Sequence, residues 1–114
     1  MALEQQQIKE LKAYYPDLSL VEDGEVEFIL ISPLPLPQGC NPESVDGLLC
    51  PSPRDGYTSR LFLSSKVTHK GPGQNWNANG VIIAGRKCWA VSWKTNQNNL
   101  SLLGMVLAHL EAFK

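Results

Sequence analysis

The sequence has few of the features that mark membrane, secreted or metal-stabilised proteins. No apolar run approaches the roughly 20 residues that span a bilayer, and residues 1–12 are polar and unlike a signal peptide. The three cysteines cannot form an even set of disulfides, and no two have the C-x-x-C spacing of zinc or redox motifs. We therefore expect a cytoplasmic protein with reduced thiols, no metal site and no membrane contact.

Motifs of the common catalytic sites are also absent. There is no G-x-S-x-G sequence, and no glycine-rich loop leads into a helix, as phosphate binding requires. Neither histidine stands in a nucleophile motif: we expect His69 to be solvated in a loop and His109 to lie at the edge of the apolar face of the last helix. No cofactor is expected, and the question becomes whether one of the free thiols reacts.

Length and turn-forming residues limit the fold. The chain of 114 residues suits a single domain, residues 1–114, that folds without disulfide or metal cross-links. Nine glycines and eight prolines argue against a helical bundle and indicate many turns.

The first part of the chain predicts a helix followed by an antiparallel hairpin. Apolar residues at helical spacing predict a helix over residues 3–15, which Pro16 ends. The pair Asp23-Gly24 separates two strand-like runs and is a strong hairpin signal. The proline run over residues 32–37 lacks three N–H groups, so we expect an extended connector there and not a central strand.

The rest of the chain predicts more strands, a loop and a closing helix. In order, the expected segments are strands over residues 45–50 and 59–65, a loop over residues 70–80, two extended runs over residues 81–84 and 88–93, a helix-capping run at residues 96–99, and an amphipathic helix over residues 100–113. This order predicts an α+β domain in which the two helices cover a four-stranded antiparallel meander.

Charge is distributed unevenly along the chain. Residues 1–57 carry ten acidic and three basic side chains, whereas residues 58–114 carry one acidic and seven basic ones. From residue 57 to residue 94 there is no carboxylate, and a stretch of one sign can attract an acidic partner or lower the pKa of a thiol. The alternative is a solvated face whose charge the acidic half neutralises.

Cys88 is the first candidate for a reactive residue. It follows Arg86 and Lys87, and a thiol beside two cations ionises more readily. The glycine turn before it allows a position at the surface; the alternative is a buried strand cysteine, since free cysteines are among the most buried residues. We expect Cys50 to belong to the core and Cys40 to lie in a loop without a role.

An asparagine-rich loop stands upstream of Cys88. Asn75, Asn77 and Asn79 alternate around Trp76, and an asparagine amide can donate a hydrogen bond to an oxyanion that forms near a nucleophile. The alternative is that asparagine and glycine simply favour turns.

Taken in order, these motifs resemble the ubiquitin-conjugating enzyme superfamily (UBC-like fold), in a compact prokaryotic form. The matching segments are Pro51 to Tyr57 with the strand that follows, at the family's proline- and tyrosine-containing stretch; Asn75 to Gly80, at its His-Pro-Asn loop; Cys88, at its active cysteine; Trp93, at the tryptophan that follows; and residues 99–107, at the helix beyond. The chain departs from the family in having no His-Pro-Asn triplet, a longer loop before the cysteine, and one helix after it where eukaryotic members have more.

The resemblance implies a conjugating enzyme that works by thioester exchange. Cys88 would accept the C-terminal acyl group of a ubiquitin-like modifier from an ATP-dependent activating enzyme and pass it to a nucleophile. Arg86 and Lys87 would favour the thiolate, and Asn77 or Asn79 would stabilise the oxyanion.

The resemblance also implies partners and a setting. In the family the activating enzyme docks on the first helix, where this chain carries Lys9 and Lys12. The implied setting is a bacterial operon with a modifier, an activating enzyme and a JAB-type isopeptidase, in some cases for antiviral defence.

Two other functions fit the same sequence. The first is a non-catalytic UBC-like module that binds a ubiquitin-like protein. The second is a small nucleic-acid-binding domain that uses the basic half of the chain and Trp76, Trp89 and Trp93 as stacking platforms. The overall isoelectric point of about 6.1 argues against the second.

Overall fold

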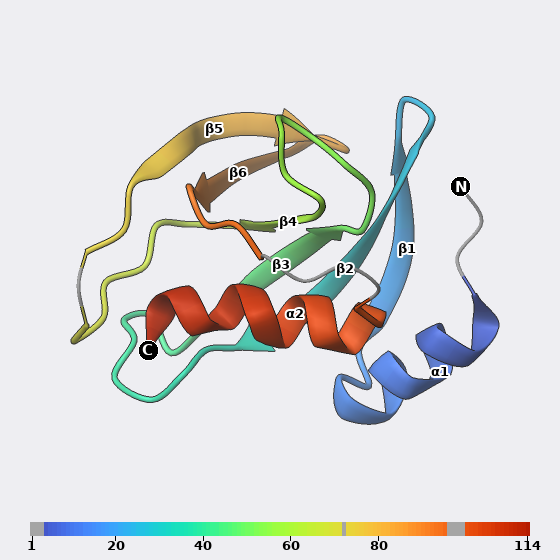
Figure 1. Ribbon diagram of the computed structural model, residues 1–114, viewed down its shortest axis with the longest axis horizontal. Coiled ribbons are helices and arrows are strands. Elements are labelled where there is room, and N and C mark those ends of the chain that lie inside the picture. Colours follow the sequence, from blue (N-terminus) through green and yellow to red (C-terminus); the bar gives the residue numbers. More distant parts are fainter. Residues whose placement is uncertain (1–3, 72, 96–99) are drawn as a thin grey trace.

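The computed structural model describes residues 4–71, 73–95 and 100–114, which form an α+β fold (Figure 1). A helix precedes an antiparallel sheet of six strands, and a second helix follows it. In chain order the elements are α1 (Gln5–Tyr14), β1 (Leu18–Asp23), β2 (Val26–Pro35), β3 (Ser44–Cys50), β4 (Arg60–Leu63), β5 (Trp76–Ile83), β6 (Arg86–Val91), α2 (Leu102–Leu110) and the single 3-10 turn η1 (Glu111–Phe113).

Both predicted helices are present. α1 ends at Tyr14, before Pro16, and buries Leu11 completely. α2 begins after Ser101, whose Oγ accepts a hydrogen bond from the backbone N–H of Gly104 and so satisfies one of the free donors of the first turn. The capping run predicted at residues 96–99 and the first residue of the predicted helix 3–15 lie outside the described residues.

The sheet has six strands where the sequence predicted a meander of four. Its order is β1-β2-β3-β4-β6-β5, with every neighbouring pair antiparallel. Residues 76–80 of the loop expected over residues 70–80 belong to β5, and two register shifts along its pairing with β6 leave Asn77 and Gly80 out of the ladder. Pairing with β6 therefore overrides the turn preference of asparagine and glycine, and the surplus residues are taken up in bulges.

The proline run also belongs to a strand. β2 extends to Pro35, which lies opposite Ser44 of β3. β1 pairs with β2 only as far as Ile31, so the prolines lie where β2 has a neighbour on one side. Leu36 N–H donates to Glu43 O, so the nitrogen of the preceding residue, Pro35, points away from β3, because backbone groups alternate in direction along a strand. The N–H that Pro35 lacks would therefore make no hydrogen bond to β3.

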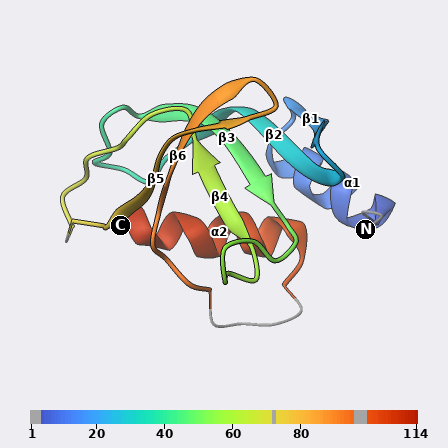
Figure 2. The ribbon, with the colours of Figure 1, turned by 90° about the horizontal axis from the view of Figure 1, so that it is seen from above.

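The sheet curls so that each of its faces encloses a separate core. α1 and α2 lie over one face (Figure 2). The core between them and the sheet includes Ile29, Ile31 and Leu49. The β5–β6 hairpin arches over the other face (Figure 1). The core beneath this hairpin includes Phe28 and Phe62.

The two ends of the curled sheet approach each other. β6 joins β4 through the single pair Leu63 and Trp89, which leaves the hairpin free to bend. The backbone N–H of Ala84, in the β5–β6 turn, donates to Asp23 Oδ2 at the β1–β2 turn over 3.3 Å. The sheet is therefore a partly closed, strongly coiled half-barrel.

Candidate functional site

The structure buries Cys88, the alternative that the sequence left open beside a reactive thiol at the surface. Its side chain is 2% exposed on β6 and packs in the core beneath the β5–β6 hairpin, close to Leu30, Leu48 and Phe62. Its Sγ donates to the backbone oxygen of Arg86 over 3.5 Å. The apolar face of the curled sheet, and not the turn before the cysteine, decides where the thiol lies.

The expected lowering of the Cys88 pKa is reversed. Burial raises the pKa of the thiol, and this effect exceeds the opposing influence of the Arg86 charge. Arg86 is exposed, and its Nη1 lies 3.5 Å from Asp46 Oδ2. Lys87 is exposed and, by the alternation of a strand, projects to the other side of β6 from Cys88. The two flanking cations therefore do not produce a thiolate here.

The other two cysteines are buried as well. Cys50 is fully buried, as predicted for a core residue. Cys40 is 6% exposed, its Sγ donates to the oxygen of Phe113, and burial raises the pKa of its thiol. All three thiols are therefore free and enclosed within the protein.

Asn77 and Asn79 lie on β5 and are engaged away from the Cys88 thiol. Asn79 lies opposite Trp89, so its side chain belongs to the face opposite Cys88, and its Nδ2 donates to the oxygen of Trp76 over 3.0 Å. Asn77 accepts a hydrogen bond from Arg60 Nη2 through its Oδ1. The structure thus gathers neither amide around the thiol.

Asn77 instead belongs to a cluster around Arg60 that the sequence did not predict. The Arg60 side chain is almost fully buried, with Nη1 3.1 Å from Asp55 Oδ2 and Nη2 3.3 Å from Val91 O. Its guanidinium lies 4.5 Å from the ring centre of Tyr57. A lone arginine at the start of a strongly apolar strand is the sequence signal for this position, because such a charge must be paired when it is buried.

Tyr57 completes this cluster. Its hydroxyl lies 2.9 Å from Ser92 Oγ and accepts a hydrogen bond from Asn77 Nδ2, also at 2.9 Å. The hydrogen bond with Ser92 is the largest influence that lowers the pKa of the phenol, followed by those of Asn77, Arg60 and Lys94. With Tyr57 and Arg60 both buried, the cluster ties the chain before β4 to β5 and β6.

The two histidines differ from expectation. His109 is one of the buried residues of α2, and its Nε2 lies 2.9 Å from Ser59 Oγ. Burial, and then the charge of Arg60, lower the pKa of its imidazole to about 4, so it is neutral at physiological pH. His69 is half-buried and packs edge-on against Phe113, with 5.8 Å between ring centres. Both rings therefore serve packing.

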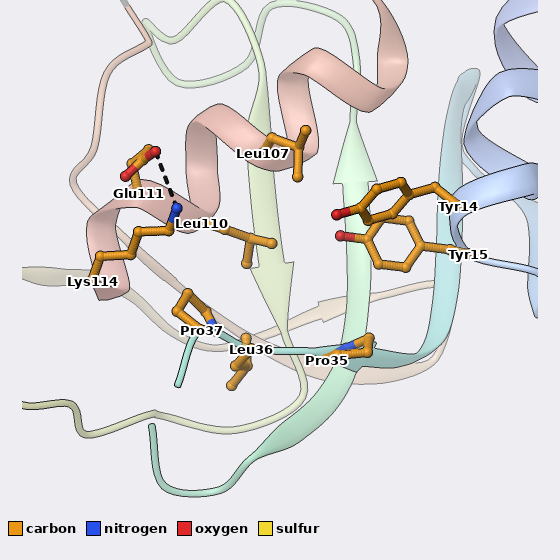
Figure 3. A pocket seen from close by; sticks show the side chains of 9 residues that line it. All are labelled: Tyr14, Tyr15, Pro35, Leu36, Pro37, Leu107, Leu110, Glu111 and Lys114. Carbon is orange, nitrogen blue, oxygen red and sulfur yellow. Dashed lines mark hydrogen bonds and ion pairs between the residues drawn. The ribbon is translucent and has the colours of Figure 1, made fainter. Parts of the chain in front are cut away.

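Lys9 and Lys12 are exposed on α1, where the sequence placed them as a docking surface. Past the end of this helix lies a groove of about 470 Å³ between α1, the end of β2 and α2 (Figure 3). Its lining residues are Tyr14, Tyr15, Pro35, Leu36, Pro37, Leu107, Leu110, Glu111 and Lys114.

The groove is mainly apolar, with polar groups at its two ends. The rings of Tyr14 and Tyr15 meet edge to face, with 4.9 Å between their centres, and their hydroxyls point into the groove (Figure 3). At the other end Lys114 Nζ lies 3.3 Å from Glu111 Oε1. Tyr14 is 58% exposed and Leu107 is 39% exposed, so two elements present apolar side chains to solvent here.

Within residues 4–71, 73–95 and 100–114, no three histidine, cysteine or acidic side chains lie close enough together to hold a metal ion. No helix of this described part is long and apolar enough to cross a membrane. Comparison of the chain with protein-family models, with curated proteins and with solved structures gives no match.

Proposed function

We propose that this chain is a non-catalytic UBC-like module that binds a ubiquitin-like protein. The observation that carries the proposal is the burial of Cys88, which is 2% exposed at the position where the resemblance expects the active cysteine. The order of helix, antiparallel strands and helix supports the UBC-like part. The coiling of the sheet over its second core distinguishes this chain from the four-stranded meander that the resemblance implies.

Thioester exchange places demands on a cysteine that Cys88 does not meet. The attacking species is the thiolate, and it must reach the carbonyl carbon of the incoming thioester. The raised pKa of Cys88 opposes the first requirement. Cys88 is buried in a cluster with Leu30, Leu48 and Phe62, which opposes the second.

The groove of Figure 3 is the surface that best fits a folded protein partner. Four large apolar side chains are strongly exposed among the described residues. Tyr14 and Leu107 line the groove from different helices, whereas Leu20 and Ile82 lie on the two edge strands of the sheet. Apolar side chains that meet at a concave site lose most water-exposed surface when a partner covers them.

Binding to a ubiquitin-like modifier from the operon that the resemblance implies tests the proposal. We expect Tyr14→Ala and Leu107→Ala each to weaken binding about tenfold in calorimetry, the usual size of effect for a central apolar contact. Ile82→Ala is the matched control, since Ile82 is 57% exposed on β5, outside the groove, and its loss should leave affinity unchanged. Absence of binding by the unmodified chain would overturn the proposal.

A charging reaction decides between binding and catalysis. With the activating enzyme, ATP and modifier, we expect no adduct on this chain that thiols cleave. An adduct that forms on the unmodified chain and is lost in Cys88→Ala, but kept in Cys40→Ala and Cys50→Ala, would instead establish Cys88 as a thioester carrier.

A further inference from the structure

β1 forms an open edge of the sheet. Its six residues pair with β2 on one side, and in the described part of the chain no other backbone group bonds to their backbone; the N–H of Ala84 reaches only the side chain of Asp23, at the end of the strand. Just before β1, Asp17 lies opposite Ser32 of β2, and Ser32 N–H donates to Asp17 O. The backbone N–H and C=O groups of these two residues therefore point toward each other. Because inward and outward pairs alternate in an antiparallel ladder, the N–H and C=O groups of Leu18, Leu20 and Glu22 point away from β2.

β5 forms the opposite edge of the sheet and is protected against pairing with an added strand, whereas β1 is not. β5 carries two register shifts in its pairing with β6, and bulges of this kind disturb the regular spacing that an added strand needs. β1 keeps one register over all six pairs, from Leu18 with Ile31 to Asp23 with Val26. It also contains neither proline nor lysine, the residues that commonly block an edge.

The side chains along this edge combine an apolar group with negative charge. Leu20 and Glu22 share the face of the sheet that α1 and α2 cover elsewhere, and Leu20 is 50% exposed because the β1–β2 hairpin extends beyond both helices (Figure 1). Glu22 lies directly opposite Glu27 on β2, a like-charge pair that destabilises the two strands. A cation placed beside Glu22 would relieve this repulsion.

The negative charge of this region is not balanced locally. Residues 13–53 contain seven carboxylates and no lysine, arginine or histidine. Among the described residues, the ion pairs of this segment are limited to the one between Asp46 and Arg86, away from the hairpin. The charge disfavours pairing between two copies of β1 and favours a basic partner.

We infer that the open edge of β1 is a docking site for an extended, basic segment of a partner protein, which joins the sheet as a further strand. Its backbone pairs with the outward groups of Leu20 and Glu22. On the face of Leu20 it presents an apolar residue and, two positions away, a lysine or arginine beside Glu22 and Glu27. This surface is separate from the groove of the proposed function.

Labelled peptides test the inference. The probe is a fluorescent, capped peptide of sequence Thr-Lys-Thr-Val-Thr-Lys-Thr, with Thr-Glu-Thr-Val-Thr-Glu-Thr and an N-methylated form of the first as controls. We expect the basic peptide alone to bind in fluorescence anisotropy, with amide shifts in β1 and weaker binding as salt is raised. Equal binding of the acidic or the N-methylated peptide would overturn the inference.

Variants of β1 locate the site. Leu20→Pro removes an outward N–H without removing a β1–β2 hydrogen bond, and Glu22→Lys reverses the local charge; each should weaken binding at least about tenfold. Glu43→Lys makes the same charge change at an exposed position outside β1 and should have little effect. Equal losses in Glu22→Lys and Glu43→Lys would show that charge alone binds the peptide and would overturn the inference.

Two further measurements distinguish the β1 edge from a dimer interface and from the groove. A dimer that light scattering detects and that Leu20→Pro abolishes would show that a second copy occupies the edge, which also contradicts the inference. Tyr14→Ala should leave peptide binding unchanged, so loss of the groove interaction and loss of the β1 interaction are measured independently.

Discussion

The two faces of the curled sheet are covered in different ways. On one face two helices lie over Ile29 and Ile31, and each helix carries its own apolar stripe. On the other face the sheet covers itself, because the β5–β6 hairpin bends over Phe28 and Phe62. The first core is assembled from elements that the sequence marks separately, whereas the second exists only after the chain has curled.

The largest expected effect is on the free energy of unfolding, and it tests whether the core under the β5–β6 hairpin is closed to solvent. Phe28 is fully buried and its ring meets that of Phe62 edge to face. Phe28→Ala should lower the free energy of unfolding by about 3–5 kcal/mol in urea denaturation, because the cavity cannot be filled from either side. A loss below about 1 kcal/mol would show that solvent already reaches this face.

The next effect concerns the helix-covered face and depends on pH. The folded pKa of His109 is about 4, below the unfolded value of 6.5, so the unfolded state binds the proton more readily between these values. The stability that depends on neutral His109 is fully present above pH 6.5 and falls by about 3 kcal/mol as the pH approaches 4. Comparing the pH dependence of urea denaturation with that of His109→Gln isolates this contribution, and identical slopes would contradict it.

A smaller effect is expected at the polar cluster where β4, β5 and β6 meet. Asn77→Ala leaves Arg60 without one of its partners and removes a donor to Tyr57. We expect a loss of about 2 kcal/mol in thermal or urea unfolding, since Arg60 is buried and charged. Asn79→Ala is the control, and an equal loss there would mean that the cluster has no special role.

The smallest expected effect is a difference in how often the two cores open to solvent. Cys40 packs with the helix-covered core and Cys88 with the hairpin-covered core. If the strands around Cys88 open less often than the loop around Cys40, a thiol reagent should label Cys88 at least about tenfold more slowly. Mass spectrometry of the labelled peptides measures both rates, and faster labelling of Cys88 would show that the hairpin opens first.

Local signals predicted much of the fold. The spacing of apolar residues and Pro16 located α1, the pair Asp23-Gly24 located the first hairpin, and the alternating run after Ser59 located β4. Each signal depends only on residues that are close together along the chain, so it can be recognised before the fold is known. The end of β2 over residues 32–35 and the start of β5 over residues 76–80 were predicted incorrectly as a connector and a loop, because both depend on which strand lies alongside.

The candidate site was less predictable than the fold. The cations beside Cys88 are next to it in sequence, but the pKa of its thiol depends on Leu30, Leu48 and Phe62, which reach it only through strands that are distant along the chain. Arg60 lies in the basic second half of the sequence, but the structure buries it and pairs it with Asp55.

The sequence by itself determined the two helices, the β1–β2 hairpin, the antiparallel character of the strands and the acidic charge of the first half, because periodicity, turn residues and composition act over short distances along the chain. The tertiary structure alone decided that β5 and β6 join the sheet, that the sheet coils over a second core, and that Cys88 lies inside it. These outcomes depend on burial of apolar surface between segments far apart in sequence, and burial is a property of the whole fold.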